Sequence, residues 1–163
     1  MNQEKDFSHI NSRGELHMVD ISHKSASERI AIAKAEVVFP EEVFEKVQSG
    51  RVPKGEFLAC AKVAGIMAAK RCWELIPLCH PIGITKVDVE FEFLKDTRSL
   101  EIKATVKTTE KTGVEMEALT AVSVSALTVY DMCKALSKEI KISNIRLIYK
   151  KGGKSGELKL EEV

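Results

Sequence analysis

Residues 111–135, KTGVEMEALTAVSVSALTVYDMCKA, predict a long helix around which the rest of the chain is organised. Thr112 and Glu115 have the spacing of a capping box, in which each side chain satisfies a free backbone N–H at the helix start. No proline interrupts the stretch up to Leu136. Many of its apolar side chains are small, so another backbone can approach closely. The apolar positions are Met116, Leu119, Ala121, Val122, Val124, Ala126, Leu127 and Val129.

Asp131 and Lys134 form a charged pair near the C-terminal end of this predicted helix. The helix dipole raises the pKa of a carboxyl group there, and a lysine three residues later on the same face offsets that effect. Because the pair is embedded among apolar residues, it is a candidate proton-transfer unit. The alternative is an ordinary surface ion pair, which the spacing alone favours.

Glu117 and Asp131 are two heptads apart, so they lie on nearly the same helix face but about 21 Å apart along the axis. One helix therefore cannot bring both carboxylates to one small ligand. Two copies packed antiparallel about a two-fold axis near Val124 would place Glu117 of one against Asp131 of the other. This geometry predicts an active site between subunits.

The composition is that of a single domain, since 163 residues suffice for one substantial core. The formal net charge of +1 gives no general basic field for nucleic acid. No apolar run approaches a membrane span and no signal-peptide pattern is present, so we expect a cytoplasmic protein without membrane association. The cysteines have no paired or metal-ligand spacing, so we expect reduced, buried thiols and no metal site. They are Cys60, Cys72, Cys79 and Cys133.

Period-2 alternation and short apolar runs predict four main strands, and two further stretches predict helices. Residues 56–75 form a helix with an unusually small face, where Gly65 invites close packing. A short helix is expected to begin after Pro40 and to end at Gly50. The predicted strands are 29–39, 84–94, 100–107 and 141–150, with a further short candidate at 18–21.

The order of the main elements, strand–helix–strand–strand–helix–strand, is typical of an α+β, ferredoxin-like fold. In that fold an antiparallel sheet carries its helices on one face. We expect residues 1–16 to be a disordered lead, 17–151 to be the single domain and 152–163 to be a flexible tail rich in glycine and lysine. RNA-recognition domains share this topology, but the exposed sheet face here lacks their aromatic residues.

Three loop segments carry candidate site residues. His80 is bracketed by two prolines and is either a general acid/base or, as is commoner for a loop histidine, structural. Lys54 precedes a glycine at a helix start and can hold an anion there, although most such lysines are simply solvated. Residues 152–156, GGKSG, lack the spacing of a nucleotide P-loop. They either close over phosphates with Lys150 and Lys154 or form a solvated basic tail.

Residues 75–87, LIPLCHPIGITKV, together with 111–135 and 152–156, resemble the MoaC family of molybdenum cofactor biosynthesis. The resemblance implies a homohexamer, a trimer of dimers, with the active site at the dimer interface. The implied substrate is (8S)-3',8-cyclo-7,8-dihydroguanosine 5'-triphosphate (cyclo-dihydroGTP), supplied by the radical-SAM enzyme MoaA. The implied products are cyclic pyranopterin monophosphate and pyrophosphate.

The same resemblance implies that Asp131 and Lys134 are catalytic. It implies no redox step and hence no flavin, nicotinamide or iron–sulfur cofactor, and it leaves room for Mg²⁺ carried by the substrate triphosphate. The alternative is a catalytically idle pterin- or nucleotide-binding relative, which the presence of both residues disfavours. The implied substrate-binding residues are Leu78, Cys79, His80, Met116, Glu117, Glu115, Lys54, Lys150 and Arg29.

Overall fold

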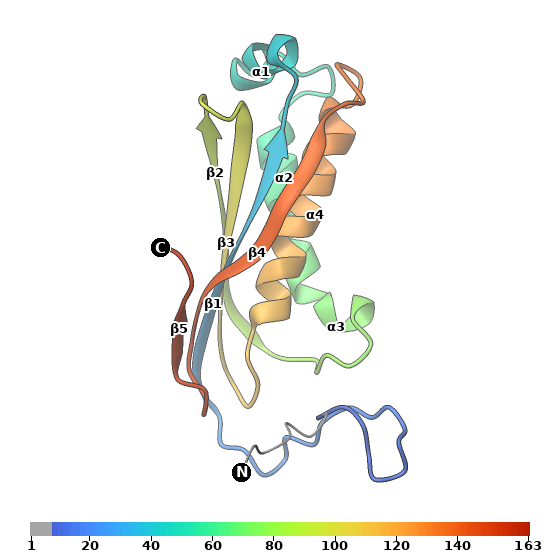
Figure 1. Cartoon of the computed structure of the whole chain (residues 1–163), viewed down its shortest axis with the longest axis vertical. Helices are drawn as coiled ribbons and strands as arrows, with labels where there is room; N and C mark the ends of the chain where they lie inside the picture. Colours follow the sequence, from blue (N-terminus) through green and yellow to red (C-terminus); the bar gives the residue numbers. More distant parts are fainter. Residues whose placement is uncertain (1–7) are drawn as a thin grey trace, which may run out of the picture.

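The computed structural model describes residues 8–163, which form one antiparallel sheet with helices on one face (Figure 1). Figure 1 shows α2 and α4 side by side behind the sheet, α1 beyond one end of the strands and α3 near the other. The elements are β1 (Ser27–Val38), α1 (Glu41–Gln48), α2 (Phe57–Lys70), α3 (Cys72–Leu75), β2 (Ile84–Leu94), β3 (Ser99–Glu110), α4 (Glu115–Cys133), β4 (Lys141–Lys151) and β5 (Glu157–Lys159).

The strands follow the spatial order β2-β3-β1-β4-β5, and every neighbouring pair is antiparallel. The first four strands with α2 and α4 give the βαββαβ arrangement, so the predicted ferredoxin-like fold is confirmed. The four main predicted strands, the short helix after Pro40 and the two long helices are all present. Strand β5 is an element that the sequence did not predict.

The core lies between the sheet and the two long helices. Ala33 and Ala35 of β1 stand opposite Ala104 and Ile102 of β3, and all four side chains are fully buried. Period-2 alternation brings these residues to one face, where α4 contacts β1, β3 and β4 and α2 contacts β2. The sheet residues facing the helices are small in the middle, which lets the helices lie close to the strands.

Helices α2 and α4 approach each other at Gly65. A Cβ built on Gly65 would overlap the Oγ of Ser125 and would lie 3.0 Å from the carbonyl oxygen of Ala121. Ser125 is buried and donates a hydrogen bond to the carbonyl oxygen of Ala61, at 2.9 Å. The small face predicted for residues 56–75 therefore packs against the small face predicted for the long helix.

Several local predictions are wrong. Helix α4 begins at Glu115 after Val114, and Thr112 makes no side-chain cap. Residues 18–21 form no strand. The helix predicted over 56–75 breaks at Arg71, and the break turns Cys72 toward α4, where its sulfur lies 3.4 Å from the Thr120 hydroxyl.

The cysteine prediction is correct in part, since the structure has all four thiols free. Cys133 is buried as expected, whereas Cys60 is exposed because it lies on the outer face of α2. No helix within residues 8–163 has both the length and the apolar character needed to cross a membrane.

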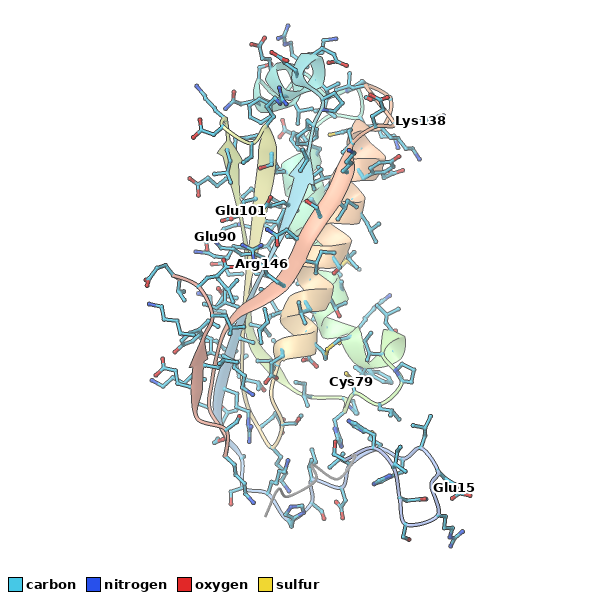
Figure 2. All side chains as sticks on the ribbon, in the orientation of Figure 1. Glu15, Cys79, Glu90, Glu101, Lys138 and Arg146 are labelled. Atoms are coloured by element: carbon cyan, nitrogen blue, oxygen red, sulfur yellow. The ribbon has the colours of Figure 1, made fainter. Side chains whose placement is uncertain are left out.

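The two ends of the chain have local structure next to the sheet. Residues 1–7 of the predicted disordered lead lie outside the described residues, while Ile10 and Leu16 form an isolated antiparallel bridge. At the other end, β5 pairs with β4, and Glu161 forms an ion pair with Arg146 on the sheet face away from the helices. Figure 2 shows Arg146 on this face, together with Glu90 and Glu101.

We expect Gly65→Ala to destabilise the fold by about 1–3 kcal/mol, because the added methyl group overpacks the contact between α2 and α4. Urea unfolding monitored by circular dichroism measures the change. Glu45→Gln, at an exposed position of α1, is the control and should change stability by less than about 0.5 kcal/mol. Equal stabilities for Gly65→Ala and the wild type would contradict the close approach.

Candidate active site

Two neighbouring cavities lie near the start of α4. The smaller cavity has a volume of about 320 Å³ and lies between the first turn of α4, the segment after α3 and the N-terminal segment. Figure 2 shows Cys79, which lines it, at the end of the molecule where the N-terminal segment passes. Six residues predicted to bind substrate line this cavity: Leu78, Cys79, His80, Glu115, Met116 and Glu117.

The larger cavity, of about 770 Å³, is strongly basic. Lys24, Arg29, Lys150 and Lys154 line it together with serine and glycine residues from both ends of the chain. The two cavities share four lining residues and therefore adjoin each other. The shared residues are Lys24, Thr112, Gly113 and Glu115.

Glu117 is a buried carboxyl group in the wall of the smaller cavity, with only 4% of its surface exposed. Burial raises the pKa of Glu117 to about 7, because the charged form loses its water, and the nearby charge of Glu115 adds to the effect. At neutral pH the group is therefore divided between its acid and carboxylate forms. A neutral carboxylic acid can donate one hydrogen bond and accept others.

His80 connects the smaller cavity to the N-terminal segment. Its Nε2 lies 2.7 Å from the carbonyl oxygen of Val19. Since a carbonyl oxygen only accepts hydrogen bonds, Nε2 carries the hydrogen, and a neutral ring then has Nδ1 as an acceptor. The hydrogen bond to Val19 supports a structural role for His80, and the ring also lines the cavity.

Cys79 lines the same cavity as a neutral thiol. Burial raises the pKa of Cys79, and the charge of Glu117 raises it further. Burial also raises the pKa of Cys72 to about 12. Neither sulfur has the lowered pKa of a nucleophilic cysteine, and Cys79 still lines the cavity where substrate binding is predicted.

Glu115 and Lys150 form an ion pair between the first turn of α4 and the end of β4, with Nζ and Oε1 2.5 Å apart. This contact explains why Glu115 does not complete the predicted capping box, since its carboxylate points to Lys150 rather than back to Thr112. Gly113 makes room for the carboxylate, because a Cβ at that position would overlap it. The pair places one carboxylate and one ammonium group at the junction of the two cavities.

Arg29 fixes the wall of the larger cavity. Its Nε donates to the carbonyl oxygen of Glu110 at 2.9 Å, and its Nη2 donates to that of Lys111 at 3.2 Å. A Cβ built on Gly153 would overlap the guanidinium group, and one on Gly152 would overlap the backbone of β1. Both glycines also have positive φ, 109° at Gly152 and 73° at Gly153, so the loop between β4 and β5 needs glycine to pass this close.

A second charged cluster lies at the opposite end of α4. Asp131 accepts contacts from Lys134 Nζ at 2.8 Å and from Lys54 Nζ at 2.9 Å. These hydrogen bonds, that of Lys134 first, lower the pKa of Asp131 to about 2, while contact with Asp131 raises the pKa of Lys134. The two lysines outweigh the helix-dipole effect expected from the sequence, and Asp131 is a carboxylate at neutral pH.

The two clusters are far apart in one protomer. Glu117 and Asp131 lie on the uninterrupted helix α4, about 21 Å apart along its axis. In Figure 2, Cys79 lies at one end of the molecule and Lys138, just beyond α4, at the other. The protomer therefore brings eight predicted residues together around the two cavities, and three at the other end. The separate three are Lys54, Asp131 and Lys134.

The sequence analysis missed the contribution of the N-terminal segment. Ser8, His9, Val19, Ile21 and Lys24 all line the smaller cavity. These residues show no periodicity, so the pattern-based reasoning found no element there. A conserved pattern in related sequences is the signal that would have identified them, and a single sequence does not contain it.

No group of three or more His, Cys, Asp or Glu side chains in the described part of the chain is arranged to hold a metal ion. The charged groups available to a ligand here are ammonium, guanidinium and carboxyl groups. Such a set can bind anionic phosphates and exchange hydrogen bonds with a polar heterocycle.

We expect the stability of the wild type to fall as pH rises from 4.5 to 7, in part because of Glu117. Its folded-state pKa of about 7 exceeds the ordinary value of 4.5, so the native state binds more protons in this window. Glu117→Gln should remove this contribution, which is on the order of 3 kcal/mol. Urea unfolding at pH 5 and pH 8 measures it.

Glu92→Gln, at an exposed position, is the matched control and should leave the pH dependence unchanged. If the stabilities of the wild type and Glu117→Gln differ by the same amount at both pH values, the raised pKa of Glu117 is wrong.

The family model and the similar proteins of known name agree on one family. The family model described as "MoaC family" matches residues 18–153. A protein of Brevibacillus brevis named cyclic pyranopterin monophosphate synthase is 52% identical over 91% of this chain and 92% of its own length. Proteins of the same name from Syntrophomonas wolfei and Heliobacterium modesticaldum are 53% and 52% identical over 94% of this chain, and over 98% and 97% of their own lengths. This chain belongs to the MoaC family.

Proposed function

We propose that the chain is a cyclic pyranopterin monophosphate synthase. It converts cyclo-dihydroGTP to cyclic pyranopterin monophosphate and pyrophosphate in molybdenum cofactor biosynthesis. The observation that carries the proposal is the pairing of a small polar cavity around Glu117 with a basic cavity around Arg29 and Lys150. A nucleotide-derived heterocycle suits the first cavity and its phosphate chain suits the second.

The carboxyl groups of the smaller cavity suit a guanine-derived ring. Such a ring has several N–H donors, which Glu115 and Glu117 can receive. Glu117 in its protonated form also offers a donor to a ring nitrogen or carbonyl oxygen. Leu78 and Met116 supply apolar surface beside these polar groups, as is usual in small-molecule sites.

The chemistry requires two kinds of help. Opening the dihydroimidazole ring and reclosing it as a pyrazine moves protons on and off nitrogen, which suits Asp131 and Lys134. In the cyclic phosphate step, a ribose-derived hydroxyl oxygen bonds to the α-phosphorus and the bond to pyrophosphate breaks. Ammonium groups stabilise the negative charge on the leaving phosphates, which suits Lys54, Lys134 and Lys150.

Bringing these groups together requires a second protomer. Glu117 and Asp131 lie at opposite ends of α4. An antiparallel arrangement of two α4 helices would therefore place Glu117 of one protomer against Asp131 of the second. The outer face of the two-helix layer carries exposed apolar side chains suited to such a contact, among them Val63, Met67 and Leu127. We propose a dimer across this face, within a homohexamer that is a trimer of dimers.

Substrate binding changes the resting state of Asp131. In the free protomer two lysines hold its pKa at about 2, which makes it a weak base. Phosphate oxygens compete for the same ammonium groups, so binding of the triphosphate weakens the contacts of Lys54 and Lys134 with Asp131. The pKa of the carboxylate then rises toward its ordinary value, and it accepts protons more readily.

The remaining expectations stay predictions. These are supply of the substrate by MoaA, a cytoplasmic location, the absence of a redox cofactor, and Mg²⁺ entering only with the triphosphate. The alternative, an idle pterin- or nucleotide-binding relative, has no specific observation in its favour, because Asp131 and Lys134 are present and in contact.

Asp131→Asn and Lys134→Ala should each lower product formation from purified cyclo-dihydroGTP by at least about 100-fold, because each removes a proton-transfer group. Chromatographic quantitation of cyclic pyranopterin monophosphate and pyrophosphate measures the loss. Lys95→Ala, at an exposed position in the turn between β2 and β3, is the control and should keep wild-type turnover. Turnover of folded Asp131→Asn near the wild-type rate would refute the acid/base assignment.

A mixture of two inactive variants tests whether the site is shared. If Glu117→Gln and Asp131→Asn protomers are coexpressed with different tags, half of randomly formed dimers are mixed, and each mixed dimer contains one intact site. About a quarter of the wild-type activity should therefore return. No recovery in a purified doubly tagged assembly would show that both residues act within one protomer.

A further inference from the structure

The N-terminal segment forms a built wall of the site rather than a loose covering. Two hydrogen bonds anchor it: His80 Nε2 to the carbonyl oxygen of Val19 at 2.7 Å, and Lys111 Nζ to the carbonyl oxygen of Ser22 at 3.1 Å. Both anchors come from segments that border the cavities. Residues 21–24, which include the second anchor, form a turn closed by a hydrogen bond from the N–H of Lys24 to the carbonyl oxygen of Ile21, at 3.1 Å. This turn precedes β1 in the chain.

Lys24 occupies a distinctive position on this wall. It is half-buried and lines both the smaller and the larger cavity, so it stands where one opens into the other. Within residues 8–163, no carboxylate lies within ion-pair distance of its ammonium group. In contrast, Lys54, Lys134 and Lys150 each contact a carboxylate.

A half-buried ammonium group at a junction of two cavities is suited to an anionic ligand oxygen. The nearest carboxyl groups do not neutralise it: Glu115 is held by Lys150, and Glu117 is only partly ionised at neutral pH. Of the other cations of the larger cavity, Arg29 uses two of its donors on backbone carbonyls, and Lys154 lines the larger cavity but not the smaller one. Among residues 8–163, the Lys24 ammonium group makes no ion pair, so its donors face the ligand space of the two cavities.

We propose that Lys24 is a further substrate-binding residue, one that holds the phosphate nearest the ribose. This inference rests on the proposed function, which puts the heterocycle in the smaller cavity and the phosphate chain in the larger one. The α-phosphate connects the two, so it lies at the junction that Lys24 lines. The α-phosphate also remains in the cyclic product, whereas pyrophosphate leaves.

The proposal predicts that loss of Lys24 affects binding of the cyclic product but not binding of pyrophosphate. Lys24→Ala should weaken binding of cyclo-dihydroGTP and of cyclic pyranopterin monophosphate by roughly 10- to 100-fold, as for a lost hydrogen bond to a charged group. Inhibition by inorganic pyrophosphate should change less than about twofold. Lys150→Ala, in the larger cavity, is the matched variant: it should weaken binding of pyrophosphate and of cyclo-dihydroGTP and change the affinity for the cyclic product by less than about twofold.

Calorimetric titration with each of the three ligands measures these affinities, and steady-state kinetics measures the accompanying rise in KM. Lys24→Arg should restore most of the affinity, since it keeps the charge. Hydrogen exchange of residues 8–24 checks that Lys24→Ala leaves the N-terminal wall in place. Unchanged affinity for the cyclic product in Lys24→Ala overturns the proposal, and so does a loss confined to pyrophosphate.

The two proposals fail separately. If the wild type binds cyclo-dihydroGTP through Lys24 but does not convert it, the synthase function is overturned and the Lys24 contact stands. If the wild type converts the substrate and Lys24→Ala binds it with wild-type affinity, only the assignment of Lys24 is overturned.

Discussion

The length of α4 is the constraint on which the rest of the site depends. A continuous helix from Glu115 to Cys133 holds Glu117 and Asp131 about 21 Å apart and gives neither a way to approach the other. The protomer thus contains two incomplete sites, one with carboxyl groups and cavities, the other with a carboxylate between two lysines. In the dimer we propose, a two-fold axis would bring Glu117 of one protomer close to Asp131 of the other, because the ends of two antiparallel helices meet in opposite order.

Small residues keep that helix in position. Gly65 of α2 and Ser125 of α4 allow the two helices to touch, and the short side chains of Ala33 and Ala35 are fully buried between the sheet and the helices. Fixed packing of this kind matters for catalysis, because groups contributed from two protomers must be placed reproducibly. The precision of the site is therefore a consequence of the core rather than of the loops alone.

The sequence was sufficient for most of the fold and for part of the site. Alternation and helix-sized apolar stretches identified the four main strands and α4, because local patterns determine those elements. The same patterns failed where a long-range contact decides the outcome. Glu115 contacts Lys150 and does not cap α4, and the pKa of Asp131 is lowered first by Lys134 and then further by Lys54, which lies 77 residues away in sequence. The role of Lys24 was hidden for the same reason, since only the folded chain carries it to the junction of two cavities.

In the proposed site, carboxylates of the protein pair with the lysines until the phosphates of the substrate replace them. Glu115 holds Lys150, and Asp131 holds Lys54 and Lys134, so these lysines are neutralised by the protein before any phosphate arrives. In the proposed site, a triphosphate that displaces those carboxylates would release them close to the heterocycle whose protons must move. Phosphate binding and proton transfer are then coupled through the same ion pairs, because an ammonium group that turns to phosphate leaves behind a carboxylate of higher pKa. In the proposed site, this coupling would raise the pKa of the carboxylates only in protomers that hold substrate.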